Sequence, residues 1–279
     1  MPELPEVETV KNALKNAIIG TKILNVEIFC RRFRIEIVPD FEQRILNATI
    51  VNLKRIAKYI IIELDNGNSI IWHLGMSGKI KTCITRPDIL QKHDHIVITL
   101  TDKIIIYNDA RRFGLVDVTE SKNLSKHPFF KNIGIDPFDK QLTAQYLFDK
   151  LRKIKTVIKI ALLDQKIING IGNIYASEAL YISGISPVRE SKDITYQECE
   201  SLITAIRNVL EKAIKAGGST LKDYIRPDGS TGYFQNQHCV YNKTGQRCPN
   251  CICDIIKTKG IRKIKQGGRS TFYCETLQK

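Results

Sequence analysis

The chain has 279 residues, of which 43% are hydrophobic and 26% are charged, so it is long enough for two domains and too apolar to be mainly disordered. It contains no apolar run near the ~18 residues of a membrane helix, and its acidic, proline-rich start lacks the features of a signal peptide, so we expect a cytoplasmic protein. The formal net charge of +14 favours nucleic acid as the partner over a merely solvated basic surface.

The first half of the chain predicts strands after one opening helix. Apolar residues at helical spacing predict that helix over residues 5–19. Two hairpins follow, each with turn-forming residues between β-rich runs: 58–64 with 69–74, and 95–100 with 104–107. Several hairpins with few helices are typical of a β-sandwich.

The second half predicts helices and ends in a basic, cysteine-bearing tail. A segment of weak periodicity at 120–137 is the expected linker. Apolar periodicity then predicts four helices: 143–153, 157–163, 174–183 and 195–216. Residues 238–279 carry nine Lys or Arg against two acidic residues, and five of the eight cysteines, which indicates metal ligation in a cytosolic chain.

The N-terminus offers a nucleophile. Once Met1 is removed, Pro2 is a secondary amine that titrates near pH ~8, so a useful fraction is unprotonated at neutral pH. Its attack on an aldehyde carbon gives an iminium, an electron sink suited to β-elimination, and Glu3 could move the protons. From composition alone, a proline-rich start is usually only a helix entry, so composition does not establish the nucleophile.

Several motifs, in order along nearly the whole chain, resemble those of the formamidopyrimidine-DNA glycosylase family. They lie at residues 1–9, 57–59, 73–78, 92–95, 109–114, 170–178, 217–223, 232–234 and 268–274. The resemblance implies an α+β protein of two domains without an organic cofactor. Residues 1–133 would form an N-terminal catalytic β-sandwich. Residues 134–237 would form a helix–two-turns–helix region, and 238–279 a zinc-finger-type β-hairpin.

The resemblance also implies an enzyme with two activities, acting as a monomer in the bacterial cytosol on double-stranded damaged DNA held in a basic cleft between the domains. Such enzymes excise 8-oxoguanine and formamidopyrimidines and cleave the strand by β,δ-elimination. Pro2 corresponds to the nucleophile and Glu3 to the general acid/base. Lys58 and Arg269 correspond to the proton donors of β- and δ-elimination.

Further roles follow from the same resemblance. Met76, Arg111 and Phe113 would fill the space left by the flipped nucleotide and hold its partner base. The implied DNA contacts are His73, His93, Arg111, Lys153, Lys155, Asn173 and Tyr241. The implied pocket for the damaged base is formed by Glu6, Ser219, Thr220 and Tyr224.

The cysteine tail departs from the family pattern of two Cys-x₂-Cys pairs. Cys248 and Cys251 form the first pair, but the partner of Cys274 is replaced by Leu277. Either Cys253 completes one structural zinc site with these three cysteines, or zinc binds weakly or not at all.

Two other functions stay open at this point. One is an oxidised-pyrimidine glycosylase of the endonuclease VIII type, although Glu-Leu-Pro at 3–5 resembles the purine-directed enzymes. The other is a non-catalytic protein that binds damaged DNA and carries a degraded finger.

Overall fold

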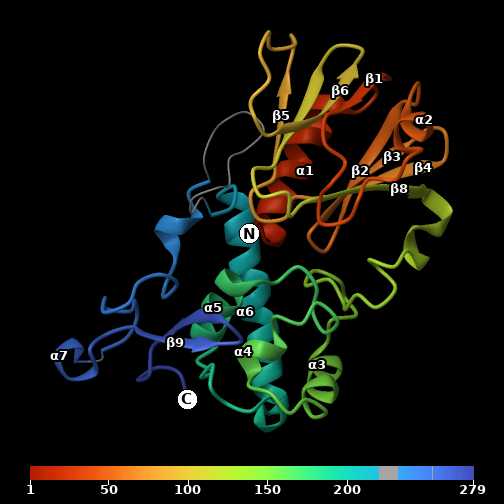
Figure 1. Cartoon of the computed structure of the whole chain (residues 1–279). Helices are drawn as coiled ribbons and strands as arrows, with labels where there is room; N and C mark the ends of the chain where they lie inside the picture. Colours follow the sequence, from red (N-terminus) through yellow and green to blue (C-terminus); the bar gives the residue numbers. More distant parts are fainter. Residues whose placement is uncertain (220–231, 253) are drawn as a thin grey trace. The chain divides into compact units, whose positions relative to one another are not determined.

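The computed structural model describes residues 1–219, 232–252 and 254–279. They divide into two compact units (Figure 1): the first unit comprises residues 1–132 and 214–235, and the second unit comprises residues 133–213 and 236–279. These units are defined by compactness alone and do not test the functional domains predicted at 1–133, 134–237 and 238–279, which stay predictions.

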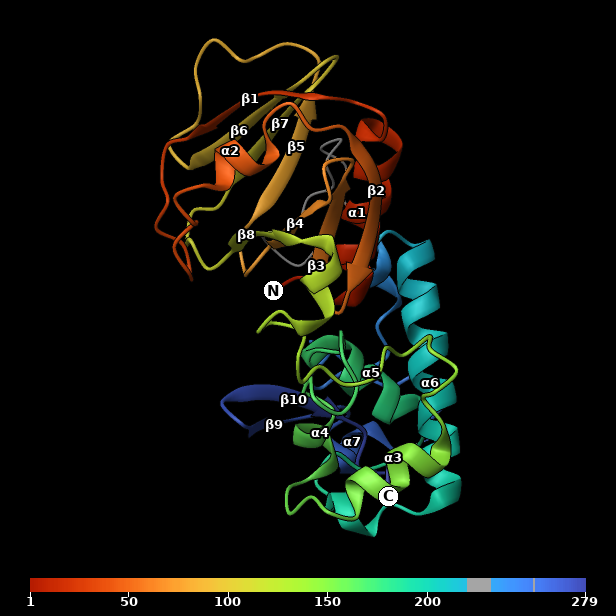
Figure 2. The same ribbon diagram turned by 90° about the vertical axis from the view of Figure 1, so that its right-hand side faces the viewer.

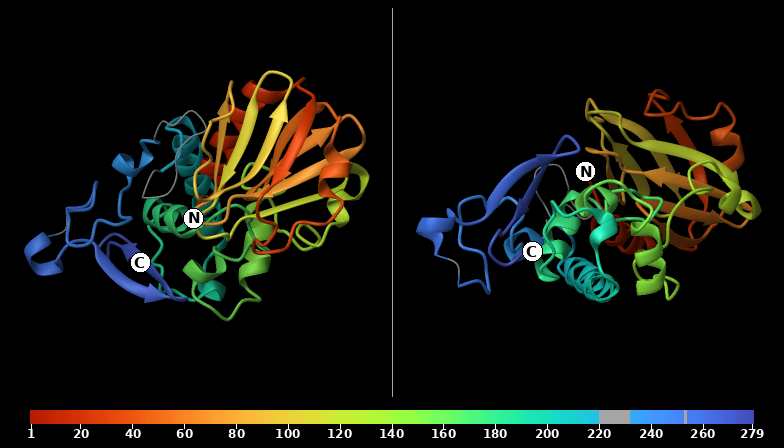
Figure 3. Two further views of the ribbon diagram at one scale, coloured as in Figure 1. Left: turned by 45° about the horizontal axis from the view of Figure 1, so that its top comes forward. Right: turned by 90° about the horizontal axis from the view of Figure 1, so that it is seen from below.

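The first unit is a sandwich of two four-stranded antiparallel sheets (Figure 3). One sheet has the order β1(Ile23–Ile28), β6(Asp94–Leu100), β7(Ile104–Asn108), β5(Lys79–Cys83). The other has the order β2(Ile50–Ile56), β3(Tyr59–Leu64), β4(Asn68–His73), β8(Leu115–Glu120). Both predicted hairpins are confirmed, because β3 pairs with β4 and β6 pairs with β7.

The opening helix closes the core of this unit. α1(Leu4–Ile18) buries Val7, Val10 and Leu14, whose helical spacing places them on one face. These side chains pack with residues of both sheets in one hydrophobic cluster. A short helix α2(Phe41–Ile45) adds to that cluster, and a 3₁₀ helix η1(Ser121–Lys126) lies within the expected linker.

The second unit contains the predicted helices, seen from the side in Figure 2. They are α3(Ala144–Leu151), α4(Ile158–Ala161), α5(Asn173–Ile182) and α6(Tyr196–Lys215), whose last two residues belong to the first unit. Three short elements accompany them: η2(Ser191–Asp193) lies between α5 and α6, and η3(Phe234–Gln237) and α7(Ile255–Thr258) follow α6. No helix in the described ranges is both long and apolar enough to span a membrane.

The tail ends in the expected antiparallel hairpin of β9(Arg262–Gln266) and β10(Arg269–Tyr273). Gly267 and Gly268 form its turn and both have positive φ, a backbone region that glycine enters without steric cost. Behind the hairpin, Tyr181 of α5 packs with Val240, Phe272 and neighbouring cysteines. The hairpin is therefore held against α5 by a small hydrophobic core of its own.

Candidate active site and nucleic-acid interface

The start of α1 is tied down by one carboxylate. Pro2 and Glu3 are buried, whereas Met1 is 52% exposed. The Glu3 amide donates to Glu6 Oε2 at 2.8 Å, and the Ser219 amide donates to Glu6 Oε1 at 2.8 Å. Glu6 thus joins the chain start to residue 219 with both oxygens. Of the residues predicted to contact the damaged base, Thr220 and Tyr224 lie outside the described residues.

Lys58 occupies the tight turn between β2 and β3. The preceding residue, Ala57, has a φ of +53°, a backbone conformation that residues other than glycine rarely adopt. Arg55 supports this turn, since its Nη1 donates to the Ala57 carbonyl at 3.0 Å and its Nε donates to Glu8 Oε2 of α1 at 2.8 Å. Lys58 is only 6% exposed, so its side chain is held within the protein and does not extend into solvent as most lysines do.

His73 lies beside this turn as a neutral imidazole. Burial, followed by the positive charges of Arg34 and Lys58, lowers the pKa of His73 to about 4. Its Nδ1 accepts a hydrogen bond from the Gly75 amide at 3.0 Å, and its ring lies 4.8 Å from that of Tyr59. The proton of neutral His73 is therefore on Nε2, which can donate to an anion without adding charge.

The three residues expected to fill the vacated space lie on two loops of the first unit. Met76 is half-buried in the turn between β4 and β5, and Arg111 and Phe113 are exposed between β7 and β8. The Arg111 guanidinium lies 4.8 Å from the centre of the Phe113 ring. A Cβ on Gly75 would lie 2.3 Å from the Phe113 carbonyl carbon, so the two loops touch backbone to backbone. His93 is half-buried and directly precedes β6.

Asn173 links helix α5 to the C-terminal hairpin by hydrogen bonds within the second unit. It begins α5, and its Nδ2 donates to the Ser270 carbonyl of the hairpin at 2.8 Å. Its Oδ1 accepts from Lys159 Nζ at 2.7 Å, and its Nδ2 also donates to Tyr241 OH at 3.5 Å. Sequence reasoning missed Lys159, although a lysine within the apolar run 157–163 is itself a signal of a buried polar contact.

The basic residues expected to contact DNA from the second unit are solvent-accessible. Lys153 and Lys155 are exposed before α4, and Arg269 is exposed at the start of β10, next to the glycine turn. Arg269 therefore lies at the tip of the hairpin with its side chain exposed to solvent.

Three cysteines form a cluster suited to a metal ion. The Sγ atoms of Cys248, Cys251 and Cys274 lie within 4.8 Å of one another, with Cys274 Sγ at 3.2 Å from the first and 3.7 Å from the second. Thiolates about 2.3 Å from a tetrahedral Zn²⁺ stand about 3.8 Å apart, so the three fit one face of such a site. Leu277 is 37% exposed, and Cys253 lies outside the described residues.

Glu178 anchors the chain leading to this cluster. The carboxylate, buried in α5, accepts hydrogen bonds from three consecutive amides, those of Cys239, Val240 and Tyr241, at 2.6, 3.0 and 2.8 Å. Burial raises the pKa of Glu178, although the three amide donors oppose this shift. Sequence reasoning gave Glu178 no role of its own, because nothing local shows what a helical glutamate contacts 60 residues later.

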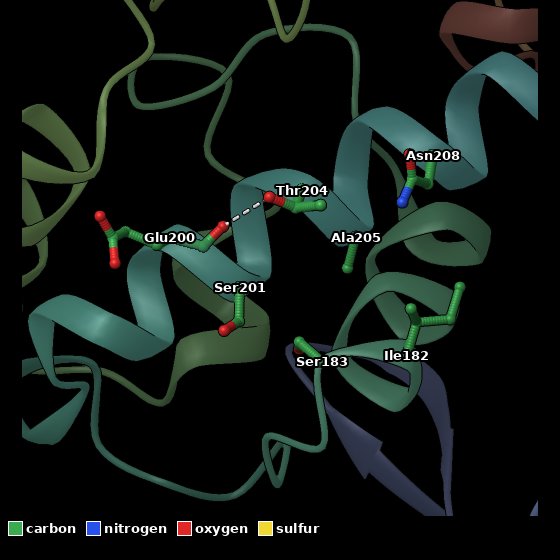
Figure 4. A pocket seen from close by; sticks show the side chains of 7 residues that line it. All are labelled: Ile182, Ser183, Glu200, Ser201, Thr204, Ala205 and Asn208. Atoms are coloured by element: carbon green, nitrogen blue, oxygen red, sulfur yellow. Dashed lines mark hydrogen bonds between the residues drawn. The ribbon is translucent and has the colours of Figure 1, made fainter.

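A separate pocket opens between α5 and α6 (Figure 4), lined by Ile182, Ser183, Glu200, Ser201, Thr204, Ala205 and Asn208. The Thr204 hydroxyl already donates to the Glu200 carbonyl at 3.0 Å. None of the predicted site residues lines this pocket.

Comparison with known proteins decides the family. The formamidopyrimidine-DNA glycosylase N-terminal domain matches residues 1–116, and the formamidopyrimidine-DNA glycosylase H2TH domain matches residues 133–224. The chain belongs to the formamidopyrimidine-DNA glycosylase family. The family predicted from the motifs is thereby confirmed, together with the fold class.

Relatives match over the full chain. The formamidopyrimidine-DNA glycosylase of Rickettsia africae is 47% identical over 279 residues, covering 100% of this chain and 99% of the relative. That of Rickettsia bellii is 44% identical over 280 residues, covering 100% of both. Two solved structures of Lactococcus lactis Fpg, one with DNA containing N7-benzyl-Fapy-dG and one with abasic-site DNA, are each 34% identical. Both have a TM-score of 0.89 and cover 99% of each chain.

Proposed function

We propose that this chain is a bifunctional DNA glycosylase and abasic-site lyase that acts on oxidised purines and abasic sites in double-stranded DNA of the bacterial cytosol. The observation that carries the proposal is the chain start: Pro2 is buried, and the amide of the next residue, Glu3, donates to the Glu6 carboxylate at the beginning of α1, in a chain that matches family members over its whole length. The net charge of +14 supports a polyanionic substrate.

The reaction begins at the Pro2 nitrogen after removal of Met1. The unprotonated amine attacks the sugar C1′, the bond from C1′ to the base breaks, and the base leaves with a proton. Glu3 takes the proton that the Pro2 nitrogen loses and passes it to the ring oxygen, which opens the sugar and leaves an iminium between Pro2 and C1′. Loss of a C2′ proton then expels the 3′-phosphate, and a second elimination expels the 5′-phosphate. Water finally releases the sugar fragment and restores the Pro2 amine.

The other roles divide between the two units. Lys58 donates a proton in β-elimination and Arg269 in δ-elimination. Met76, Arg111 and Phe113 replace the flipped nucleotide and hold its partner base. Phosphates are bound by His73, His93, Lys153, Lys155, Asn173 and Tyr241. Glu6, Ser219, Thr220 and Tyr224 border the damaged base.

We also propose that Cys248, Cys251 and Cys274 hold one structural zinc ion, with Cys253 as the fourth ligand. Bound zinc supplies a cross-link between thiolates that stabilises a small hairpin. The role of the hairpin residues themselves is to present Arg269, through the glycine turn at 267–268, to the DNA.

Borohydride trapping on a duplex with one 8-oxoguanine opposite cytosine tests the proposal. We expect a covalent adduct, and peptide mass mapping should place it on Pro2. The chain that retains Met1 should give no adduct. Pro2→Gly replaces the secondary amine by a primary amine. The imine formed by a primary amine can lose its proton and become neutral, so trapping of this variant should be weaker. An adduct on a lysine in place of Pro2 would overturn the mechanism.

A second duplex separates the remaining functions. One solved L. lactis Fpg structure contains oxidised-pyrimidine DNA, which makes the purine–pyrimidine boundary worth measuring directly. Trapping on thymine glycol but not on 8-oxoguanine would favour a pyrimidine-directed enzyme. Salt-sensitive binding without trapping on either duplex would favour a non-catalytic binding protein.

A further inference from the structure

One buried carboxylate lies between the two loops that carry Met76, Arg111 and Phe113. Asp109 is 0% exposed. The Ser77 hydroxyl donates to its Oδ1 at 2.5 Å, and the Gly114 amide donates to its Oδ2 at 2.8 Å. The Tyr107 hydroxyl also donates to Oδ2, at 3.3 Å. Asp109 therefore bonds to the loop after β4 through Ser77 and to its own loop through Gly114.

The Arg111 backbone completes this network. Its amide donates to Ser77 Oγ at 3.1 Å and to Asp109 Oδ1 at 3.3 Å. Ser77 thus donates to the carboxylate while accepting from the residue that carries the exposed guanidinium. Removing either side chain would leave a buried donor or acceptor without its partner, which costs more than an ordinary hydrogen bond contributes.

The two loops pack closely around Asp109 and its partner Tyr107. A Cβ on Gly114 would lie 1.8 Å from the Tyr107 hydroxyl, and a Cβ on Gly78 would lie 2.5 Å from the same oxygen. The hydroxyl is therefore enclosed by two glycines, one from each loop. Hydrogen bonds and steric fit therefore favour the same relative position of the two loops.

We propose that Asp109 is a positioning residue that holds the two loops carrying Met76, Arg111 and Phe113 in place before DNA binds. Ser77 takes part by hydrogen bonding to both Asp109 and the Arg111 amide. The inference rests on the proposed function, which assigns that task to Met76, Arg111 and Phe113. Inserting side chains into a duplex costs unstacking energy, and loops that had to order at the same time would add their own entropy cost. A pre-ordered pair of loops removes the second cost. Asp109 should therefore matter only where a stacked duplex must be opened.

Asp109→Asn, Ser77→Ala and Tyr107→Phe test this inference against the control Asp102→Asn. Asp102 is an exposed aspartate in the β6–β7 turn, so the control makes the same charge change in the same sheet. Three substrates are compared under single-turnover conditions: 8-oxoguanine in a duplex, an abasic site in a duplex, and an abasic site in a single strand. A 2-aminopurine next to the lesion reports loop insertion by fluorescence, and thermal unfolding followed by circular dichroism reports folding.

We expect Asp109→Asn to slow excision of duplex 8-oxoguanine and the 2-aminopurine signal together by about 10-fold or more, because a hydrogen bond to a charged group contributes on that order. Single-strand abasic cleavage should change less than threefold. Ser77→Ala should show the same selectivity with a smaller loss, and Asp102→Asn should match the wild type.

Equal loss on all three substrates would show a merely structural role and overturn the inference, as would wild-type excision by folded Asp109→Asn. If Asp109→Asn does not fold, Ser77→Ala and Tyr107→Phe decide on the same criteria. A wild-type protein inactive on every substrate would instead contradict the proposed function.

Discussion

At the residue scale, the buried His73 ring makes stability depend on pH. Its pKa falls from the ordinary value of 6.5 to about 4 through burial and through nearby positive charge. Between these two pH values the unfolded chain binds a proton on His73 that the folded chain does not bind. The contribution of neutral His73 to the free energy of unfolding is therefore fully present above pH ~6.5 and is lost as the pH falls toward ~4. At 1.36 kcal/mol per pKa unit, the full loss is on the order of 3 kcal/mol.

His73→Gln should remove this loss. We expect the free energy of unfolding of the wild type to drop by about 2–3 kcal/mol more than that of the variant between pH 7 and pH 4.5. Urea unfolding followed by the fluorescence of Trp72 measures it, since Trp72 is the only tryptophan and lies buried beside His73 in β4. Parallel pH curves for the two proteins would show that His73 is not the group responsible.

Residues with a local signature could be predicted from the sequence, and residues defined by a distant partner could not. Met76 lies between Gly75 and Ser77, two residues that favour turns, and the structure places Met76 in a turn. By contrast, Glu6 was expected only to border a pocket, whereas its carboxylate binds the amides of Glu3 and Ser219. Position 219 is 213 residues away, and no periodicity or turn rule reaches that far.

At the element scale, Arg55 couples α1 to the turn that carries Lys58. The pKa of the Glu8 carboxyl is lowered: burial alone would raise it, but the hydrogen bonds and charges of Lys11 and Arg55 outweigh burial. Arg55→Gln should therefore lower the turnover rate by about 10-fold with little change in KM, because Lys58 loses its position relative to the chain start. Stability of the first unit should fall by about 1–2 kcal/mol.

Single-turnover kinetics across a substrate series separate these effects for Arg55→Gln. Lys54→Gln is the matched control, since Lys54 is the neighbouring strand residue and pairs with Glu63 at 2.5 Å, away from the turn. A purely structural role for Arg55 would lower stability and leave the turnover rate of the folded enzyme unchanged.

Glu178 is the second element-scale device, because it holds three amides ahead of the cysteine hairpin. Glu178→Gln keeps the shape but replaces one accepting oxygen with a donor, so about 1–3 kcal/mol of local stability should be lost. We expect faster zinc loss to a chelator and a higher ratio of β- to β,δ-elimination product. Glu200→Gln, an exposed glutamate of α6, should change neither quantity.

At the scale of the whole molecule, sequence patterns predicted one hairpin in each sheet and the four helices, because each depends on neighbours within about 20 residues. It did not indicate that residues 214–235 would group with the first unit, since that grouping depends on long-range packing. The net charge, unlike long-range packing, can be obtained from the amino-acid composition alone. Half of the +14 net charge lies in residues 238–279.

Charge therefore gives the broadest test of the DNA-binding surface. The logarithm of the binding constant should fall linearly with the logarithm of salt concentration, with a slope of about −0.9 for each phosphate neutralised. Arg269→Gln, Lys153→Gln and Lys155→Gln should each reduce that slope by about 1 if the residue contacts a phosphate. His73→Gln should weaken binding with an unchanged slope, because a neutral imidazole releases no counterion. Lys122→Gln, whose side chain is 78% exposed and pairs with Glu120, is the control for removing a charge that meets no phosphate. An equal change of slope for Lys122→Gln and Arg269→Gln would mean that overall charge, and not a defined surface, governs binding.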